Sequence, residues 1–186
     1  MKKQNNIAKQ TAVLGAGCFW SVESIFKRLK GVFSVVPGYA DGNSPRPTYE
    51  KVSLGSTGHA ETVKIEFDPT IISYADLIDV FFNIHDPTTL NRQANDVGQQ
   101  YRSIILYASE EQKKIAEKSI SQLEAGKIFD DPIVTEVKPL VNFFPAEDYH
   151  QSYYEKNQNQ PYCQLVIGPK LKNLEQKFSH LLKDHV

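Results

Sequence analysis

Short runs of apolar positions with different periods divide the chain into strands and helices. Residues 11–14 form an apolar run typical of a buried strand, and the glycine-containing segment 15–17 interrupts it. After this break the apolar positions recur every three or four residues, which predicts a helix that ends at Gly31. Residues 32–36 predict a second strand, and we expect Pro37-Gly38 to stop it.

The middle of the chain has the clearest pattern. Residues 62–67 alternate between apolar and polar positions, as a half-buried strand does. Ser73 is typical of a helix cap, and Asp76 at the third helical position predicts a capping box for a helix that runs to Asn83. Residues 86–100 are polar and lack any period, which predicts a long loop that is either functional or disordered.

The last third of the chain contains shorter runs. Strands are predicted at residues 102–107 and 133–137, and helices between Ser109 and Gly126, at 146–156 and at 171–183. This order predicts an α+β fold, a split β-α-β (ferredoxin-like) two-layer sandwich with extra C-terminal helices. We expect a single domain over residues 1–186, with a flexible start at 1–10 and a C-terminal extension at 157–186.

Composition narrows the function classes. The chain has 186 residues, of which 40% are hydrophobic, and this suits one globular domain. A formal net charge of −1 would not draw it to nucleic acid or to anionic lipid. No apolar run is long enough for a membrane span, and the polar start does not lead into a signal segment. We therefore expect a cytoplasmic monomer with neither nucleic acid nor a membrane as partner.

The chain has two cysteines, Cys18 and Cys163, which are too few for a disulfide scaffold. Cys18 stands where the first strand gives way to a helix, and backbone N–H groups and the helix dipole favour a thiolate there. The alternative is a small apolar residue that fills the junction. Gly15-Ala16-Gly17 could open a dinucleotide motif, but Trp20 stands in place of the third glycine, which argues against a nucleotide cofactor.

Two aromatic residues, Phe19 and Trp20, directly follow Cys18. Aromatic rings at a helix start can wall a pocket for a methyl or thioether group. The alternative is packing into the core, which suits Phe19 because it shares the apolar stripe of the helix. Trp20 lies off that stripe, which favours the pocket.

Acid and phenol candidates lie at the ends of predicted strands. Glu61 stands at the start of the alternating run, where an apolar pocket would raise its pKa and make it a proton donor. The alternative is a solvated charge. Tyr39 and Tyr101 are phenols at junctions of loop and strand, and the alternative is core packing, which is usual for buried tyrosines. We expect no metal site, because tight ligand spacing is missing around His59, Glu61, His85, Asp86 and His150.

Six motifs, in order along the chain, resemble the signature of the A-type peptide methionine sulfoxide reductases. They are GCFW at 17–20, PGYA at 37–40, GHAE at 58–61, HDPTT at 85–89, RQxNDxGxQYRS at 92–103 and AEDYHQ at 146–151. Together they cover about the whole span from Gly15 to Gln151. Chance explains one such match but not six in order.

The resemblance implies an enzyme, a peptide-methionine (S)-S-oxide reductase that repairs oxidative damage. It would reduce the S epimer of methionine sulfoxide, in proteins or free, to methionine. Cys18 would attack the sulfoxide sulfur and become a sulfenic acid. Glu61 would protonate the sulfoxide oxygen, assisted by hydrogen bonds from Tyr39 and Tyr101.

The resemblance also assigns substrate contacts and a reductant. Phe19 and Trp20 would hold the substrate methyl group, and Asp96 would order the site. Pro161-Tyr162-Cys163 resembles the resolving-cysteine segment of the family, which implies a thioredoxin-like thiol reductant and no bound cofactor. The tail departs from the pattern because no glycine-rich stretch follows Cys163, so a buried thiol on a short strand is the alternative.

Two further departures stand near the motifs. Ser21 excludes a local Cys-x-x-Cys disulfide, and Asp41 replaces a common small residue. A cysteine hydrolase that uses Cys18 with His59 or His150 as base is a competing hypothesis, as is a non-enzymatic module with an aromatic pocket. A hydrolase would need a group that orients the histidine, and the sequence reveals none.

Overall fold

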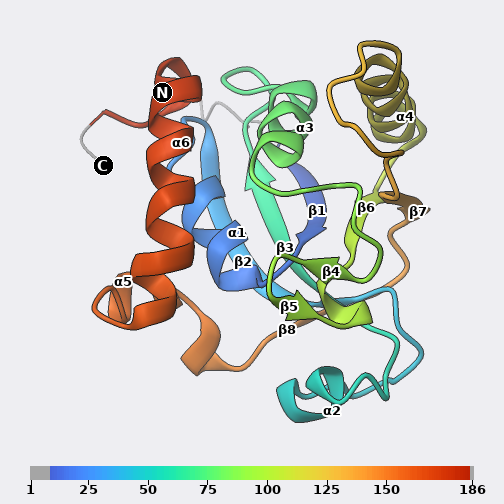
Figure 1. Cartoon of the computed structure of the whole chain (residues 1–186), viewed down its shortest axis with the longest axis vertical. Helices are drawn as coiled ribbons and strands as arrows, with labels where there is room; N and C mark the ends of the chain where they lie inside the picture. Colours follow the sequence, from blue (N-terminus) through green and yellow to red (C-terminus); the bar gives the residue numbers. More distant parts are fainter. Residues whose placement is uncertain (1–8, 185–186) are drawn as a thin grey trace, which may run out of the picture.

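A six-stranded sheet, in the order β7-β6-β1-β3-β2-β8, organises the computed structural model, which describes residues 9–184 (Figure 1). Its strands are β1 (Gln10–Ala16), β2 (Val32–Ala40), β3 (Ala60–Phe67), β6 (Ser103–Tyr107), β7 (Glu136–Pro139) and β8 (Phe143–Pro145). A small hairpin pairs β4 (Arg92–Gln93) with β5 (Asp96–Val97). The helices are α1 (Phe19–Phe26), α2 (Tyr49–Ser53), α3 (Tyr74–Asn83), α4 (Glu110–Ala125), α5 (Tyr153–Lys156) and α6 (Gly168–Phe178).

The four central strands have the predicted split β-α-β topology. Helix α1 connects β1 to β2, and β3 lies between these two strands and runs antiparallel to both. Helix α3 leads from β3 towards β6, which pairs antiparallel with β1 on its other side. Strand β7 extends the sheet in parallel beside β6, and β8 closes the opposite edge beside β2. The predicted α+β fold class is confirmed.

The sheet is buried on both faces, but unequally. Along β1, Ala12 and Leu14 face the main core, which also contains the buried sides of α1, α3 and α6. Val13 points the other way, into a small cluster with Ala60 and Ile104. This alternation follows from the two-residue period of a strand. In Figure 1 α6 lies alongside α1, so the C-terminal segment covers the helix that begins after Cys18.

Two predicted helices form with the caps that the sequence indicated. Ser73 and Asp76 make the reciprocal capping box at the start of α3. Ser109 accepts from the backbone N–H of Gln112 at the start of α4, and Gly126 ends that helix. Side chains next to each helix in the sequence determine where α3 and α4 begin, so the sequence was sufficient to predict both starts.

Strand β2 does not stop at Pro37-Gly38 but continues to Ala40. The Pro37 carbonyl accepts the N–H of Ala146, so it points away from β3. Because the N–H and C=O of one strand residue point to the same side, the missing N–H of Pro37 breaks no bond to β3. The expected stop was therefore wrong, and the extension brings Tyr39 opposite Glu61.

The first and last predicted helices are both shorter than expected. Helix α1 ends at Phe26 and α6 at Phe178, followed by a 3-10 turn at Ser179–Leu181. The N–H of Lys30 instead donates to Leu181, and that of Lys183 donates to Arg28. These backbone N–H groups therefore connect the residues after α1 to the residues after α6, instead of extending either helix.

The predicted helix over 146–156 was wrong. A 3-10 turn at Asp148–His150 and the short α5 replace it, with Ser152 between them at φ 57°. The N–H of Ala146 donates to Pro37 and the N–H of Ser152 donates to Glu23, 2.8 Å away. The backbone N–H groups of Ala146 and Ser152 therefore bond to distant residues rather than within a helix. His150, between them, is buried in the core.

The remaining differences concern short segments. The long polar stretch at 86–100 contains the β4–β5 hairpin and leads into a 3-10 turn at Gln99–Tyr101. Strand β7 begins at Glu136 rather than at residue 133. Cys163 begins a π-helical segment, Cys163–Ile167, and not a strand. Of the start predicted to be flexible, residues 1–8 lie outside the described part, while Gln10 begins β1. Within residues 9–184 no helix is long and apolar enough to cross a membrane.

Candidate active site

Cys18 is the residue immediately before α1, at the strand–helix junction that the sequence indicated. Its side chain lines a cavity of about 190 Å³. Residues 93–96 of the β4–β5 hairpin form one wall, and Tyr162, Val166 and Lys170 of the C-terminal segment form another. The structure thus encloses the candidate nucleophile between two segments far from it in sequence.

The glycines before Cys18 are required by neighbouring protein atoms. Gly17 has φ +87°, and a Cβ there would lie 2.7 Å from the Gln93 side chain. A Cβ on Gly15 would lie 2.8 Å from the Glu61 carbonyl oxygen. The absence of side chains therefore lets the hairpin and β3 approach the nucleophile closely.

Glu61 is buried beside the start of α1, with only 2% of its surface exposed. Its Oε2 accepts the backbone N–H of Phe19 at 3.0 Å. Burial raises the pKa of Glu61 to about 8, and Asp96 adds to the rise, while the Phe19 N–H opposes it. A solvated strand-end charge is therefore excluded, and the carboxyl group holds its proton at neutral pH.

The Cys18 thiol departs from its expected ionisation. Desolvation raises the pKa of Cys18 above its ordinary value, and the nearby Glu61 raises it further. Tyr162 and the backbone N–H of Trp20 oppose the rise but do not overcome it. A helix start was expected to favour the thiolate, and at this buried site desolvation outweighs that effect. The resting pair is thus a thiol and a carboxylic acid.

The hydroxyl groups of the two candidate tyrosines differ in their hydrogen bonding. Tyr39 is fully buried in β2, and its hydroxyl donates to Glu147 Oε2 at 2.7 Å. Tyr101 ends the 3-10 turn, and burial raises its pKa, with Glu61 and Cys18 contributing. Within the described residues the Tyr101 hydroxyl has no hydrogen bond. Tyr101 is therefore free to donate to a substrate, whereas Tyr39 is occupied.

The aromatic residues after Cys18 do not form an open wall. Phe19 is 1% exposed and packs 5.0 Å from the His150 ring, which fits the core alternative. Trp20 stacks on Tyr153 with ring centroids 3.6 Å apart and planes 6° from parallel. Its Nε1 donates to His150 Nδ1 at 3.0 Å. Tyrosines of the C-terminal segment thus occupy the indole surface predicted to hold a substrate methyl group.

The C-terminal segment also engages Asp96 and carries the second thiol. The Tyr162 hydroxyl donates to Asp96 Oδ2 at 3.0 Å and contacts the Cys18 thiol. Cys163, the next residue, is 1% exposed in the π-helical segment, and burial raises its pKa. Both cysteines are free thiols. One side chain therefore bridges Asp96 and Cys18 directly beside the candidate resolving cysteine.

Several residues of this site were not singled out as candidates from sequence. Glu147 accepts from the Tyr39 hydroxyl and from the backbone N–H of Tyr49. His150, which the sequence suggested only as a hydrolase base or a metal ligand, instead accepts the Trp20 indole N–H. A buried indole N–H generally needs an acceptor, and this could have pointed to a partner such as His150. Tyr153 and Tyr162 had no comparable signal.

Histidines elsewhere are engaged in other contacts. His59 lies 2.9 Å from the Ser44 carbonyl oxygen, and His85 lies between Phe81 and Ser103. Neither histidine proposed as a hydrolase base, His59 or His150, bonds to Cys18 in the described structure. No group of three potential metal ligands occurs within residues 9–184.

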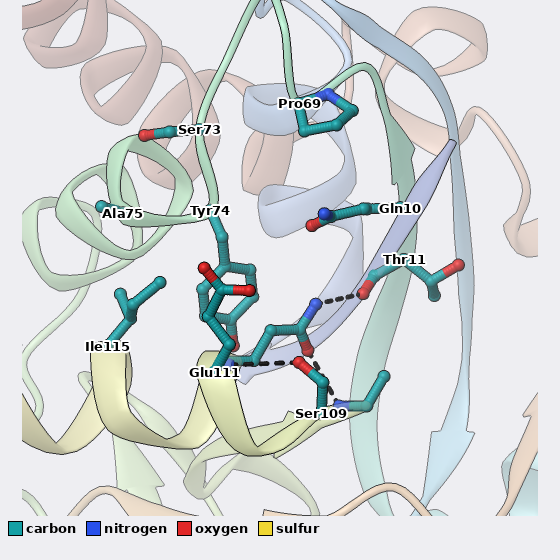
Figure 2. A pocket seen from close by; sticks show the side chains of 11 residues that line it. Gln10, Thr11, Pro69, Ser73, Tyr74, Ala75, Ser109, Glu111 and Ile115 are labelled. Atoms are coloured by element: carbon teal, nitrogen blue, oxygen red, sulfur yellow. Dashed lines mark hydrogen bonds between the residues drawn. The ribbon is translucent and has the colours of Figure 1, made fainter. Parts of the chain in front are cut away.

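A larger cavity lies elsewhere in the fold (Figure 2). It measures about 520 Å³ and lies where β1 meets the first turns of α3 and α4. Its lining includes Thr11, Tyr74 and Glu111 but neither cysteine. The cavity that contains Cys18 is therefore the smaller of these two cavities.

Known proteins share both the sequence and the fold. Residues 10–182 match the family model described as peptide methionine sulfoxide reductase. The peptide methionine sulfoxide reductase MsrA of Saccharolobus solfataricus is 55% identical over 95% of this chain and 98% of that protein. The crystal structure of reduced Mxr1 from Saccharomyces cerevisiae has a TM-score of 0.76 and 33% identity, covering 87% of this chain and 92% of that chain.

A second structure of Mxr1, in complex with Trx2, has a TM-score of 0.55 and 25% identity, covering 82% of this chain and 90% of that chain. The match to the family model spans every strand of the sheet and both cysteines. The six motifs, the thiol beside a buried acid and these similarities lead to one conclusion: the chain belongs to the peptide methionine sulfoxide reductase family.

Proposed function

We propose that Cys18 and Glu61 carry out the family reaction in this chain, the thiol-dependent reduction of methionine sulfoxide to methionine. The observation that carries the proposal is the buried Glu61 carboxyl group, which is bonded to the backbone of the residue after Cys18. With a pKa of about 8, this acid holds its proton at neutral pH, where a sulfoxide oxygen needs one.

The proposed step conserves protons and electrons. Cys18 loses its proton to solvent, and the sulfur attacks the sulfoxide sulfur while Glu61 gives its proton to the sulfoxide oxygen. The oxygen leaves with Cys18 as a sulfenic acid, and the sulfide of methionine departs. Cys18 is oxidised by two electrons and the substrate sulfur is reduced by two. The proton that Cys18 released restores Glu61.

Tyr101 is the better placed donor to the sulfoxide oxygen, because its hydroxyl has no other bond within the described residues. Tyr39 acts through Glu147, which holds it opposite Glu61 on the neighbouring strand. Phe19 and Trp20 contact the substrate methyl group once Tyr153 leaves the indole surface. Asp96 orders this side through Tyr162.

Cys163 resolves the sulfenic acid by forming a disulfide with Cys18. Its neighbour Tyr162 already contacts the Cys18 thiol, so a local rearrangement would exchange one residue for the next. A disulfide requires the two α-carbons to come within roughly 7 Å. A thioredoxin-like dithiol then reduces the disulfide, and the complex of the related Mxr1 with Trx2 supports that partner. Substrates are oxidised proteins and peptides, with the S epimer preferred.

Steady-state assays on the separated S and R epimers test this proposal. With dithiothreitol as reductant, we expect turnover of the S epimer only and its loss in Cys18→Ser. The matched control is Cys163→Ser, which should retain turnover with dithiothreitol but lose turnover with thioredoxin. A folded Cys18→Ser variant with near-normal turnover would contradict the assignment of the nucleophile.

A further inference from the structure

A single cation lines the Cys18 cavity. Lys170 lies in the first turn of α6 and lines the cavity together with residues 93–96 of the β4–β5 hairpin. Among the eight residues around this cavity it is the only one with a positive charge. Within residues 9–184 its ammonium group has neither a hydrogen bond nor an ion pair.

This unpaired position is costly for the fold. Lys170 is half-buried, and desolvation lowers its pKa, while Cys18 and Asp96 oppose that fall. A buried ammonium normally acquires a carboxylate partner or remains in water at the end of its stem. The other lysine of the same turn, Lys172, is exposed. The charge of Lys170 therefore contributes no evident stability.

The other groups that face Cys18 oppose its ionisation or are neutral. Glu61 of β3 and Asp96 of β5 raise the pKa of the thiol, and Tyr162 and the Trp20 N–H lower it by hydrogen bonding. Cys18 in turn raises the pKa of Tyr49 and Tyr101. None of these residues supplies a positive charge when the thiol proton leaves.

We propose that Lys170 is a positioning residue for the reaction, whose ammonium group stabilises the Cys18 thiolate across their shared cavity. This inference rests on the proposed function, because it concerns the thiolate that attacks the sulfoxide. The same charge would stabilise Cys18 as the leaving thiolate when an external dithiol reduces the disulfide. Nucleophilic attack and leaving-group departure both favour a thiolate of lower basicity here.

Alkylation of Cys18 by iodoacetamide at a series of pH values tests the proposal without any sulfoxide. The reagent is uncharged, and mass mapping of the Cys18 peptide separates its reaction from that of Cys163. We expect Lys170→Met to react about tenfold more slowly at neutral pH, with its profile shifted up by about one pH unit. Lys170→Arg should restore the parent profile, and the matched control Lys172→Met should leave it unchanged.

Folding of the variant is expected, because Lys170→Met replaces an unpaired half-buried charge with an apolar chain of similar length. Lys170→Gln provides a second neutral variant if Met perturbs packing. Superimposable alkylation profiles for Lys170→Met and the parent would overturn the proposal. It would also be overturned if Lys170→Met raised only the KM for free methionine sulfoxide, because that result indicates recognition of the substrate carboxylate. Neither result depends on which epimer is reduced. The proposal for Lys170 and the proposed function are therefore tested by different outcomes.

Discussion

At the level of single residues, the site holds a thiol and an acid that are both protonated at rest. Desolvation raises the pKa of Cys18 and the pKa of Glu61, the latter to about 8. At neutral pH the carboxyl group therefore keeps the proton that we propose it donates, and the proposed nucleophile rests as a thiol. Burial thus favours the protonated form of the proposed acid and disfavours ionisation of the proposed nucleophile.

Glu61→Gln is the first prediction at this scale. Gln keeps the volume and can accept from Phe19 N–H, but it cannot donate a carboxyl proton, so the rate should fall on the order of a hundredfold. The parent rate should decline as pH rises past about 8, where Glu61 loses its proton, and the variant should lack that decline. A rate reduced by less than about threefold would assign the acid role to another residue.

The same substitution has an effect on stability whose sign follows from the pKa. Folded Glu61 keeps its proton up to about pH 8, whereas the unfolded chain releases it near the ordinary value of 4.5. The unfolded state therefore binds fewer protons between these values, and stability falls as pH rises through that window. Glu61→Gln should remove this fall, which denaturant unfolding of parent and variant at both ends of the window would measure.

Tyr101→Phe and Tyr39→Phe should differ in kind. The Tyr101 hydroxyl has no partner within the described residues, so its removal should lower kcat about tenfold or more with little change in stability. The Tyr39 hydroxyl donates to Glu147, so its removal should cost about 1 kcal/mol of stability and less of the rate. Equal losses of kcat in the two variants would contradict this division.

Sequence singled out candidate site residues but gave little information on what surrounds them. Cys18 was recognisable from the strand–helix junction alone, and Glu61 gained support only from the resemblance. The pKa of Cys18 was predicted in the wrong direction, because the segments that bury the thiol, residues 93–96 and 162–170, are distant from it in sequence. The same reason explains Trp20, whose open face was expected and whose partner is Tyr153.

At the level of elements, the extension of β2 and the loop after it hold the acid side of the site. Asp41, which follows β2, has φ +58° and binds Arg102 at 2.8 Å and Lys138 at 3.0 Å. Arg102 precedes β6 and is only 7% exposed. Asp41, which departs from the family pattern, thus connects the end of β2 to Lys138 of β7, at the opposite edge of the sheet.

Asp41→Asn should therefore destabilise the fold without abolishing chemistry. Asn tolerates the left-handed backbone but leaves the buried Arg102 with a weaker partner, so we expect a loss of about 1–2 kcal/mol. Denaturant unfolding measures this loss, and activity below the transition should remain near that of the parent. The matched control is Asp79→Asn, an exposed acid of α3, which should change stability little. Equal stability of the two variants would show that the network contributes nothing.

Elements with local signals were predicted and those with tertiary causes were not. The caps at Ser73 and Ser109 lie in the sequence beside the helices they begin. Strand β2 continues past Pro37 because β8 and residue 146 lie on the side of the strand that faces away from β3. The helix predicted at 146–156 does not form, because its N–H groups donate to Pro37 and Glu23 instead. No local pattern contains that information.

At the level of the whole molecule, the order of strands and helices was enough for the split β-α-β core. It did not reveal that the C-terminal segment returns across α1 and covers Cys18. We propose that the described chain folds as one domain, because α6 shares the main core with α1 and α3. Under the proposed mechanism, we expect the segment that carries Cys163 to move relative to Trp20 and Cys18 during catalysis.

A single turnover without reductant tests the central claim most directly. The protein contains one methionine, Met1, so the enzyme itself contributes little to a measurement of the methionine residues formed in a sulfoxide peptide. We predict one equivalent of methionine residue per protein from the S epimer, with mass mapping that finds a disulfide joining Cys18 and Cys163. The variant Cys163→Ser should release the same equivalent and retain a sulfenic acid at Cys18. Release by a folded Cys18→Ser variant, or no release by the parent, would contradict the account.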